Sequence, residues 1–117
     1  MIYLLNSLVI PIDPKISVTW VRMKRATVEE VRNLLMTNNW ESAVGHEGTA
    51  SLLSKLLGVE VPMRRVSIYA KPGDLLIHFA LRTRLPEGRV LSEEELRQLD
   101  FEFIVSEVYG DVPPQRG

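Results

Sequence analysis

A single histidine, His46, stands between two glycines in the stretch SAVGHEGTA, residues 42–50, just ahead of a strongly helical run. The first amides of a helix lack intrahelical partners and the helix dipole favours negative charge, so a helix start can seat a phosphate. Gly45 and Gly48 would let that phosphate approach the backbone closely. An imidazole at the same place could protonate an oxygen leaving the phosphorus. The motif indicates acid catalysis on a phosphate, although a plain helix start between two glycines has the same pattern.

The distribution of charge favours a small anionic ligand. With 14 basic and 15 acidic residues, the net charge is −1, which argues against binding a long polyanion such as duplex DNA. Residues 60–90 nevertheless hold six basic side chains against three acidic ones, whereas residues 91–117 hold seven acidic side chains and two arginines. A compact anion suits this local excess.

Two stretches, residues 64–70 and 74–84, alternate polar and apolar side chains as strands do. One face of the second would carry His78, Ala80, Arg82 and Arg84. Arg65 lies on the polar face of the first. Joined by a turn at residues 71–74, the two strands would form a hairpin that gathers arginines, or they would present an ordinary solvated face. We assign His78 to the solvated face.

Two further stretches combine polar groups with turn formers. In RLPEG, residues 84–88, a rigid turn separates Arg84 from Glu87, whose carboxylate could pair with an arginine, a ribose hydroxyl or a histidine. In YLLNS, residues 3–7, a strand ends in Asn6 and Ser7. Both residue types are common in turns, and both can hydrogen-bond a base or a ribose.

Metal and cofactor chemistry find little support. The chain has no cysteine, which excludes disulfides and thiolate zinc sites, and its two histidines share no carboxylate at ligand spacing. A phosphate-binding Walker loop, a dinucleotide glycine fingerprint and a nucleophile elbow are all lacking. We therefore expect a basic site without metal or cofactor, centred on His46.

The elements that must position these groups follow from periodicity and caps. Strands are expected at residues 2–5, 17–23, 64–70, 74–84 and 101–109. Helices are expected from the capping box Thr27–Glu30 to about Met36, from His46 to Leu57 with a stop at Gly58, and from the capping box Ser92–Glu95 to Leu99. This pattern predicts an α/β protein with a single mixed β-sheet of about five strands flanked by about three helices.

The chain has the size of one domain, which we place at residues 1–109, and residues 110–117 read as a disordered tail. No stretch approaches the ~20 apolar residues of a membrane helix. The apolar start, MIYLLNSLVIPI, lacks the basic region and cleavage site of a signal peptide. We expect a soluble cytoplasmic protein, acting in the host cytoplasm if the chain is viral.

Three blocks together resemble one known family. YLLNS at residues 3–7, SAVGHEGTASLLSKLLGVEVPMRRV at 42–66 and RLPEGRVLSEEEL at 84–96 are similar to the viral ring nucleases, or type III anti-CRISPR proteins, of archaeal viruses and some bacteria. The similarity runs in order over about residues 2–108. The chain departs from the family pattern at Gly48, where relatives often carry another small residue, and in its extra tail.

The resemblance implies a homodimer that clasps cyclic tetra-adenylate on its twofold axis and cleaves it without metal. A ribose 2′-hydroxyl attacks the adjacent phosphorus, a histidine protonates the departing 5′-oxygen, and linear di-adenylates with 2′,3′-cyclic phosphate ends result. It implies His46 as the general acid and Glu87 as the group that positions or polarises the reacting atoms. Arg65, Arg84 and Asn6 match the family's ligand contacts, with Ser7 and Gly45 beside them.

Two other classes of function stay open from the sequence. A small DNA-binding regulator would use a basic edge formed by Trp20, Arg22, Lys24 and Arg25, but the near-neutral charge makes duplex DNA an unfavourable partner. A binding-only sponge for the cyclic nucleotide, or a protein adaptor, would not require both His46 and Glu87.

Overall fold

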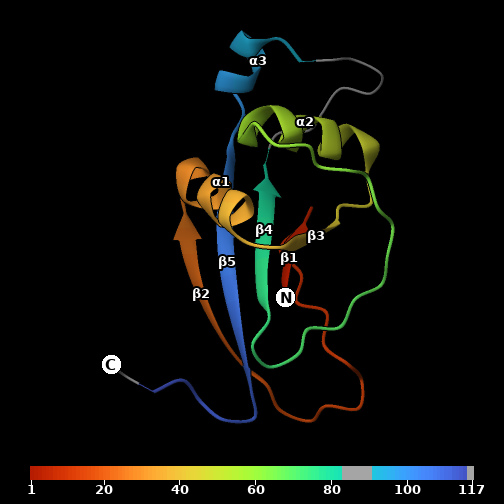
Figure 1. Cartoon of the computed structure of the whole chain (residues 1–117), viewed down its shortest axis with the longest axis vertical. Helices are drawn as coiled ribbons and strands as arrows, with labels where there is room; N and C mark the ends of the chain where they lie inside the picture. Colours follow the sequence, from red (N-terminus) through yellow and green to blue (C-terminus); the bar gives the residue numbers. More distant parts are fainter. Residues whose placement is uncertain (83–90, 116–117) are drawn as a thin grey trace.

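The computed structural model describes residues 1–82 and 91–115 and builds them around one five-stranded mixed sheet (Figure 1). The strands are β1 (Ile2–Leu5), β2 (Trp20–Ala26), β3 (Trp40–Ala43), β4 (Leu75–Leu81) and β5 (Phe101–Gly110). The helices of the described part are α1 (Val28–Thr37), α2 (Glu47–Leu57) and α3 (Glu93–Arg97). The predicted α/β class and single mixed sheet are confirmed.

The strand order is β2-β5-β4-β1-β3. β1 runs parallel to both of its neighbours, β3 and β4, whereas β5 runs antiparallel to β4 and to β2. The sheet thus has a parallel half and an antiparallel half. In the parallel half, the carboxyl ends of three neighbouring strands point to the same edge.

Local signals account for the helix boundaries. Thr27 Oγ1 accepts from the amide of Glu30 at 3.1 Å, and the Glu30 carboxylate accepts from the amide of Thr27 at 3.2 Å, which is the predicted capping box. α2 stops at Gly58, which takes the left-handed conformation with φ 67°. Arg32 of α1 donates from Nε to the carbonyl of Leu57 at 2.8 Å. A cation thereby satisfies a terminal carbonyl of α2 and ties the two helices together.

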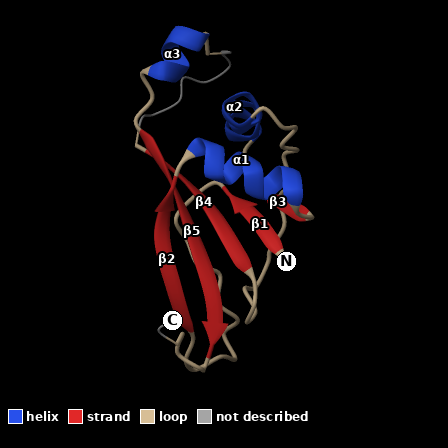
Figure 2. Ribbon diagram, turned by 60° about the vertical axis from the view of Figure 1, so that its left-hand side comes forward, coloured by secondary structure: helices blue, strands red, loops and turns tan. Residues whose placement is uncertain are grey.

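The two faces of the sheet are covered differently. α1 and α2 lie on one face, over a core that includes Leu4, Val31, Leu53 and Phe79 (Figure 2). Loops cover the other face, where Ala70, Leu76 and Val108 are buried together. α3 lies beyond the end of the sheet, next to the start of β5 (Figure 1). Among the described residues, no helix is both long and apolar enough to cross a membrane.

The predicted strand at residues 64–70 is wrong. The segment runs as a loop, and β4 pairs with β1 on one side and β5 on the other. Because both edges of β4 are occupied, the expected hairpin partner has no edge to join. The turn itself is present: the amide of Asp74 donates to the carbonyl of Lys71 at 2.9 Å, and Gly73 has φ 93°. The turn connects a loop, and not a strand, to β4.

Two other boundaries also differ from expectation. β3, a short strand at the edge of the sheet, was not predicted, because WESA is short and does not alternate. β2 begins at Trp20 rather than at residue 17, since Trp20 already pairs with Gly110, the last residue of β5. A strand extends only as far as its partner. Gly110 thus belongs to β5, and residues 116–117 lie outside the described residues.

Candidate functional site

The parallel half of the sheet collects the ends of its strands at one edge. Leu5, the last residue of β1, lies opposite Ala43 at the end of β3 and opposite His78 in β4. The loop after β1 passes to the loop-covered face, where Ile10 packs against the buried residues, whereas α2 follows β3 on the helical face. Ligands of α/β sheets bind outside carboxyl strand ends where such neighbouring connections diverge. This edge is the candidate site.

The predicted site residues follow these strand ends. Asn6 and Ser7 come directly after β1, and Gly45 and His46 come directly before α2, a short step after β3. Arg84 and Glu87 belong to the segment after β4, but both lie outside the described residues. Asn6, Ser7, Gly45 and His46 therefore lie at one edge of the sheet.

His46 is the N-cap residue of α2, with φ −126° and ψ 123°. Its carbonyl accepts the first helical bond, from the amide of Ala50 at 2.9 Å, but its side chain makes no capping bond. The residue is exposed. An ordinary N-cap side chain would accept from the helix amides, so the imidazole and the first-turn amides stay available to a ligand. Glu47 in the same turn carries the opposite charge to the helix end.

A second loop segment runs beside the stretch that leads to His46. The hydroxyl of Ser42 donates to the carbonyl of Pro62 at 2.6 Å, and the amide of Arg64 donates to the carbonyl of Val44 at 2.7 Å. Ser42 is buried at the end of β3. These bonds hold the segment 62–66 against the site as a loop, an arrangement that the alternation of its residues does not predict.

Arg65 lies directly against Gly45. Its Nε donates to the Gly45 carbonyl at 2.9 Å, and a β-carbon built on Gly45 would lie 3.2 Å from Arg65 Cγ. Close packing against Arg65 is therefore a structural reason for a glycine at position 45, independent of any ligand. The bond uses only the Nε–H of the guanidinium, which is exposed. Arg64 differs, since it pairs with Glu41 at 3.4 Å.

Gly48 has a different environment from Gly45. A β-carbon on Gly48 would meet no atom of the described residues within 4 Å. Nothing in the packing of these residues requires a glycine there, and the position is exposed at the second residue of α2. The missing side chain leaves space above the first turn of the helix.

His78 contacts the turn after β1 through the carbonyl of Ser7. His78 is completely buried, so its assignment to a solvated face is wrong. The alternation itself was correct, because Ile77 and Phe79 face the helices and His78 faces away. Loops cover that second face and exclude water. The ring lies 3.0 Å from the Ser7 carbonyl and 2.8 Å from the hydroxyl of Ser106, and burial lowers the pKa of His78.

Arg82, at the end of β4, is engaged in ion pairs. It contacts Asp100 at 2.8 Å and Glu102 at 3.1 Å, and Arg25 contacts the same Glu102 at 3.0 Å. The hydrogen bond from Arg25 is the main cause that lowers the pKa of Glu102. Arg82 is held in this exposed network, which separates it from the candidate ligand contacts.

The proposed basic edge for DNA lies on β2, an outer strand of the sheet. Arg22 and Lys24 alternate with Arg25, whose side chain pairs with Glu102. The positive side chains are therefore divided between two faces of the strand. Such a division does not form the continuous basic stripe that a duplex favours.

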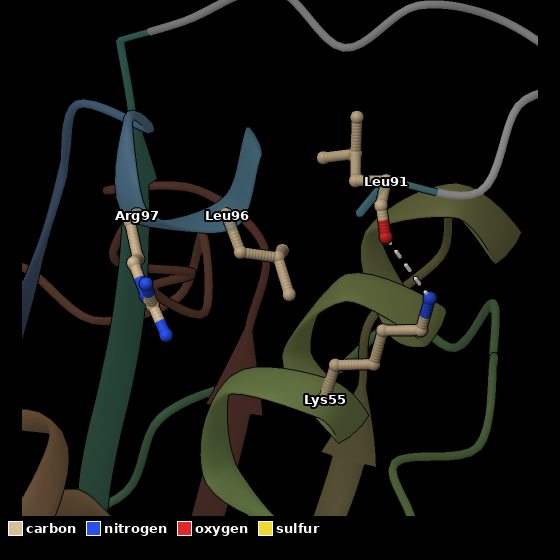
Figure 3. Close-up of a pocket in the computed structure, with 4 residues that line it drawn as sticks. All are labelled: Lys55, Leu91, Leu96 and Arg97. Atoms are coloured by element: carbon tan, nitrogen blue, oxygen red, sulfur yellow. Dashed lines mark hydrogen bonds between the residues drawn. The ribbon is translucent and has the colours of Figure 1, made fainter. Parts of the chain in front are cut away.

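A hollow of about 640 Å³ opens between α2 and α3 (Figure 3). Lys55, Leu91, Leu96 and Arg97 line it, and the Lys55 ammonium donates to the carbonyl of Leu91 at 3.3 Å. Lys55 stands in the last turn of α2, so about 13 Å of helix separates it from His46 at the other end. The hollow is not part of the candidate site.

Among the described residues, no group of three or more acidic, histidine or cysteine side chains is arranged to hold a metal ion.

Comparison with known proteins gives consistent matches over most of the chain. The family model STIV B116-like matches residues 2–103. Uncharacterized protein 26 of Sulfolobus islandicus filamentous virus is 40% identical over 109 residues, 92% of each chain. Protein ORF117 of Acidianus two-tailed virus is 36% identical over 104 residues, 86% of this chain and 87% of the other. Protein YddF of Bacillus subtilis is 30% identical over 101 residues, 85% of this chain and 89% of its own.

The solved structure of B116 from Sulfolobus turreted icosahedral virus shares the fold. The two structures superpose with a TM-score of 0.75, over 91% of this chain and 97% of that one. Their sequences are 24% identical, so this likeness concerns the fold alone.

Proposed function

Because the chain belongs to the STIV B116-like family, which includes proteins of archaeal viruses, and has Asn6, Ser7 and His46 at one sheet edge, we propose that it is a ring nuclease. Its substrate in this proposal is cyclic tetra-adenylate. The observation that carries the proposal is His46 at the start of α2, exposed, free of a capping bond and beside Arg65. The resemblance of residues 42–66 and 84–96 to viral ring nucleases supplies the substrate.

The chemistry needs an oriented ring and a proton donor. The 2′-hydroxyl gives its proton to solvent water as its oxygen attacks the adjacent phosphorus, and the bond from phosphorus to the 5′-oxygen breaks. His46, as imidazolium, donates its proton to that oxygen. Two such cleavages convert the ring into two linear di-adenylates with 2′,3′-cyclic phosphate ends. Orientation of an internal nucleophile supplies much of the rate, so no water or metal needs to be activated.

The remaining groups bind and orient the ring. Arg65 has a guanidinium beside the helix start, suited to a phosphate or a base edge. The amides that follow Gly45 form the phosphate seat, and Asn6 and Ser7 provide hydrogen bonds to a base or ribose. Arg84 as a ligand contact and Glu87 as a catalytic orienting group rest on the resemblance alone. Loss of the ring would silence type III CRISPR signalling.

We expect the active form to be a homodimer with its cleft on the twofold axis. One chain cannot surround a ring with fourfold repetition, and a self-complementary contact is the usual form of a dimer. Sedimentation at micromolar concentration should show a species of twice 13.3 kDa. A 13.3 kDa species alone would contradict this expectation.

The decisive test incubates the purified protein with labelled cyclic tetra-adenylate in EDTA and identifies the products by mass spectrometry. Di-adenylates with 2′,3′-cyclic phosphate ends support the proposal. Binding without cleavage would instead make the protein a sponge. Absence of binding, together with salt-sensitive affinity for duplex DNA, would favour a DNA-binding regulator. Ser51→Ala, on the exposed side of α2, is a control that should cleave at the wild-type rate.

A further inference from the structure

The second histidine of the chain, His78, has no role in the proposed cleavage, yet it joins three segments of the fold. Its side chain is completely buried in the centre of β4. Nδ1 lies 3.0 Å from the carbonyl oxygen of Ser7, and Nε2 lies 2.8 Å from the hydroxyl oxygen of Ser106 in β5. The ring therefore connects the turn after β1 with the antiparallel half of the sheet.

The two partners decide where the proton of the ring resides. A carbonyl oxygen can only accept, so the nitrogen that faces Ser7 must be Nδ1–H. In the neutral ring Nε2 is then an acceptor, and the hydroxyl of Ser106 donates to it. Burial disfavours the charged ring and lowers the pKa of His78, in agreement with a neutral state. The contacts thus select one tautomer of one charge state.

The Ser7 carbonyl belongs to the turn after β1, which carries the candidate ligand residues Asn6 and Ser7. Leu5 and His78 are register partners across β1 and β4, and the ring reaches two residues beyond the end of β1. Asn6 and Ser7 stand within that reach. Further along the same loop, the Pro11 carbonyl accepts from the amide of Ala70 at 2.8 Å. Of these two bonds, the one from Nδ1 lies nearer to the two candidate ligand residues.

We propose that His78 is a positioning residue of the candidate site: its neutral ring, protonated on Nδ1, holds the Ser7 carbonyl and so orients Asn6 and Ser7 toward the bound nucleotide. The role of the oriented side chains rests on the proposed function. The tautomer and the anchoring of the turn do not, and they can be tested without any ligand.

Two substitutions separate the two bonds of the ring. In His78→Asn the amide nitrogen reaches the place of Nδ1 and can still donate to Ser7. In His78→Gln it reaches the place of Nε2 and keeps only the contact with Ser106. Ser106→Ala is the matched control, since it removes the Ser106 bond and leaves the Ser7 bond. Cooperative thermal unfolding identifies the variants that fold.

The first measurement is the affinity for cyclic tetra-adenylate, with the single-turnover cleavage rate measured separately. His78→Gln should weaken binding about tenfold or more, the scale of one well-placed hydrogen bond, and leave the bound-state rate within about threefold. His78→Asn and Ser106→Ala should bind within about threefold of the wild type. Equal affinities of the Asn and Gln variants, or wild-type affinity of His78→Gln, would overturn the proposal.

The second measurement needs no ligand. Nitrogen-15 spectra of the wild-type imidazole should show the Nδ1-protonated neutral form of His78. Amide hydrogen exchange at residues 6–8 should be faster in His78→Gln than in His78→Asn or the wild type. An Nε2-protonated ring overturns the proposal even if the Gln variant does not fold. If the wild type binds no cyclic nucleotide but both results hold, the proposed function fails and the anchoring of the turn stands.

Discussion

The two histidines of the chain occupy opposite environments. His46 is exposed at the start of α2, and its side chain makes no capping bond. His78 is completely buried in β4, with both ring nitrogens bonded. An imidazole must be accessible to transfer a proton to a ligand. His46 is exposed and meets that condition, whereas His78 is buried and does not.

The comparison shows that the position of a side chain in the fold decides which role it can have, even when two side chains are chemically identical. The buried ring is fixed in one tautomer and gives order to a turn. The exposed ring makes no capping bond to its own helix. Substitutions at the two positions should therefore fail in different ways, one in catalysis and the other in stability and binding.

The largest expected effect belongs to His46→Ala. A general acid typically contributes about 10²–10⁴-fold, so the single-turnover cleavage rate should fall at least about 100-fold while stability and ring affinity stay near wild type. Single-turnover assays with excess protein measure the rate, and calorimetry measures the affinity. Cleavage within a few-fold of wild type would return His46 to an ordinary helix start.

His78→Ala should instead destabilise the protein by about 2–4 kcal/mol, through a cavity and an unsatisfied Ser7 carbonyl. In the wild type, the pKa of His78 is lowered in the folded state, so the unfolded chain binds the proton more tightly. The stability that the neutral ring contributes is present above pH 6.5, the ordinary value, and is lost as pH falls below it toward the folded pKa. Urea unfolding at several pH values tests this. His78→Asn should show a shallower decline, and an unchanged decline would contradict the linkage.

Arg65→Ala should weaken ring binding by about 1.5–3 kcal/mol, the usual contribution of a charge-assisted hydrogen bond, and should affect the bound-state rate less. Arg65→Lys should recover only part of the affinity, because an ammonium cannot reproduce the planar fork. Calorimetry on both variants measures the loss. Arg64→Ala is the matched control, since Arg64 pairs with Glu41 and not with the site. Equal losses for the two arginines would remove the special role of Arg65.

The smallest effects are expected at the two glycines. Gly48→Ala should stabilise the protein by up to about 1 kcal/mol, because the added methyl, inside a helix, meets no atom of the described residues within 4 Å. It should weaken ring binding if a phosphate needs that space. Gly45→Ala should displace Arg65, whose Cγ lies 3.2 Å from the new atom. Thermal melts with and without the ring distinguish the two, and identical behaviour would show that neither glycine serves the ligand.

Local signals in the sequence predicted much of the fold. The Thr27–Glu30 and Ser92–Glu95 capping boxes and the stop at Gly58 all act between residues that are close in the chain. Their geometry is complete within a single turn of helix, so no distant partner can change it. The alternation in β4 was also readable, and it assigned Ile77 and His78 to opposite faces correctly.

Errors arose where a residue depends on a distant partner. Residues 64–70 alternate like a strand, but both edges of β4 were already taken by β1 and β5. β3 pairs with β1 over a stretch too short to show a period. His78 shares the polar alternation of a solvated face, and only the loops that cover that face bury it.

For the site, the sequence alone determined that a histidine between glycines begins a helix, because caps and glycines act within a few residues. Its likeness to a family suggested the chemistry. Only the tertiary structure decided that Arg65 rather than Arg64 lies against Gly45, and that the second histidine is a buried anchor of the Ser7 turn. Hydrogen bonds between segments 20 and 71 positions apart depend on the packing of the whole sheet, and no local pattern of residues encodes them.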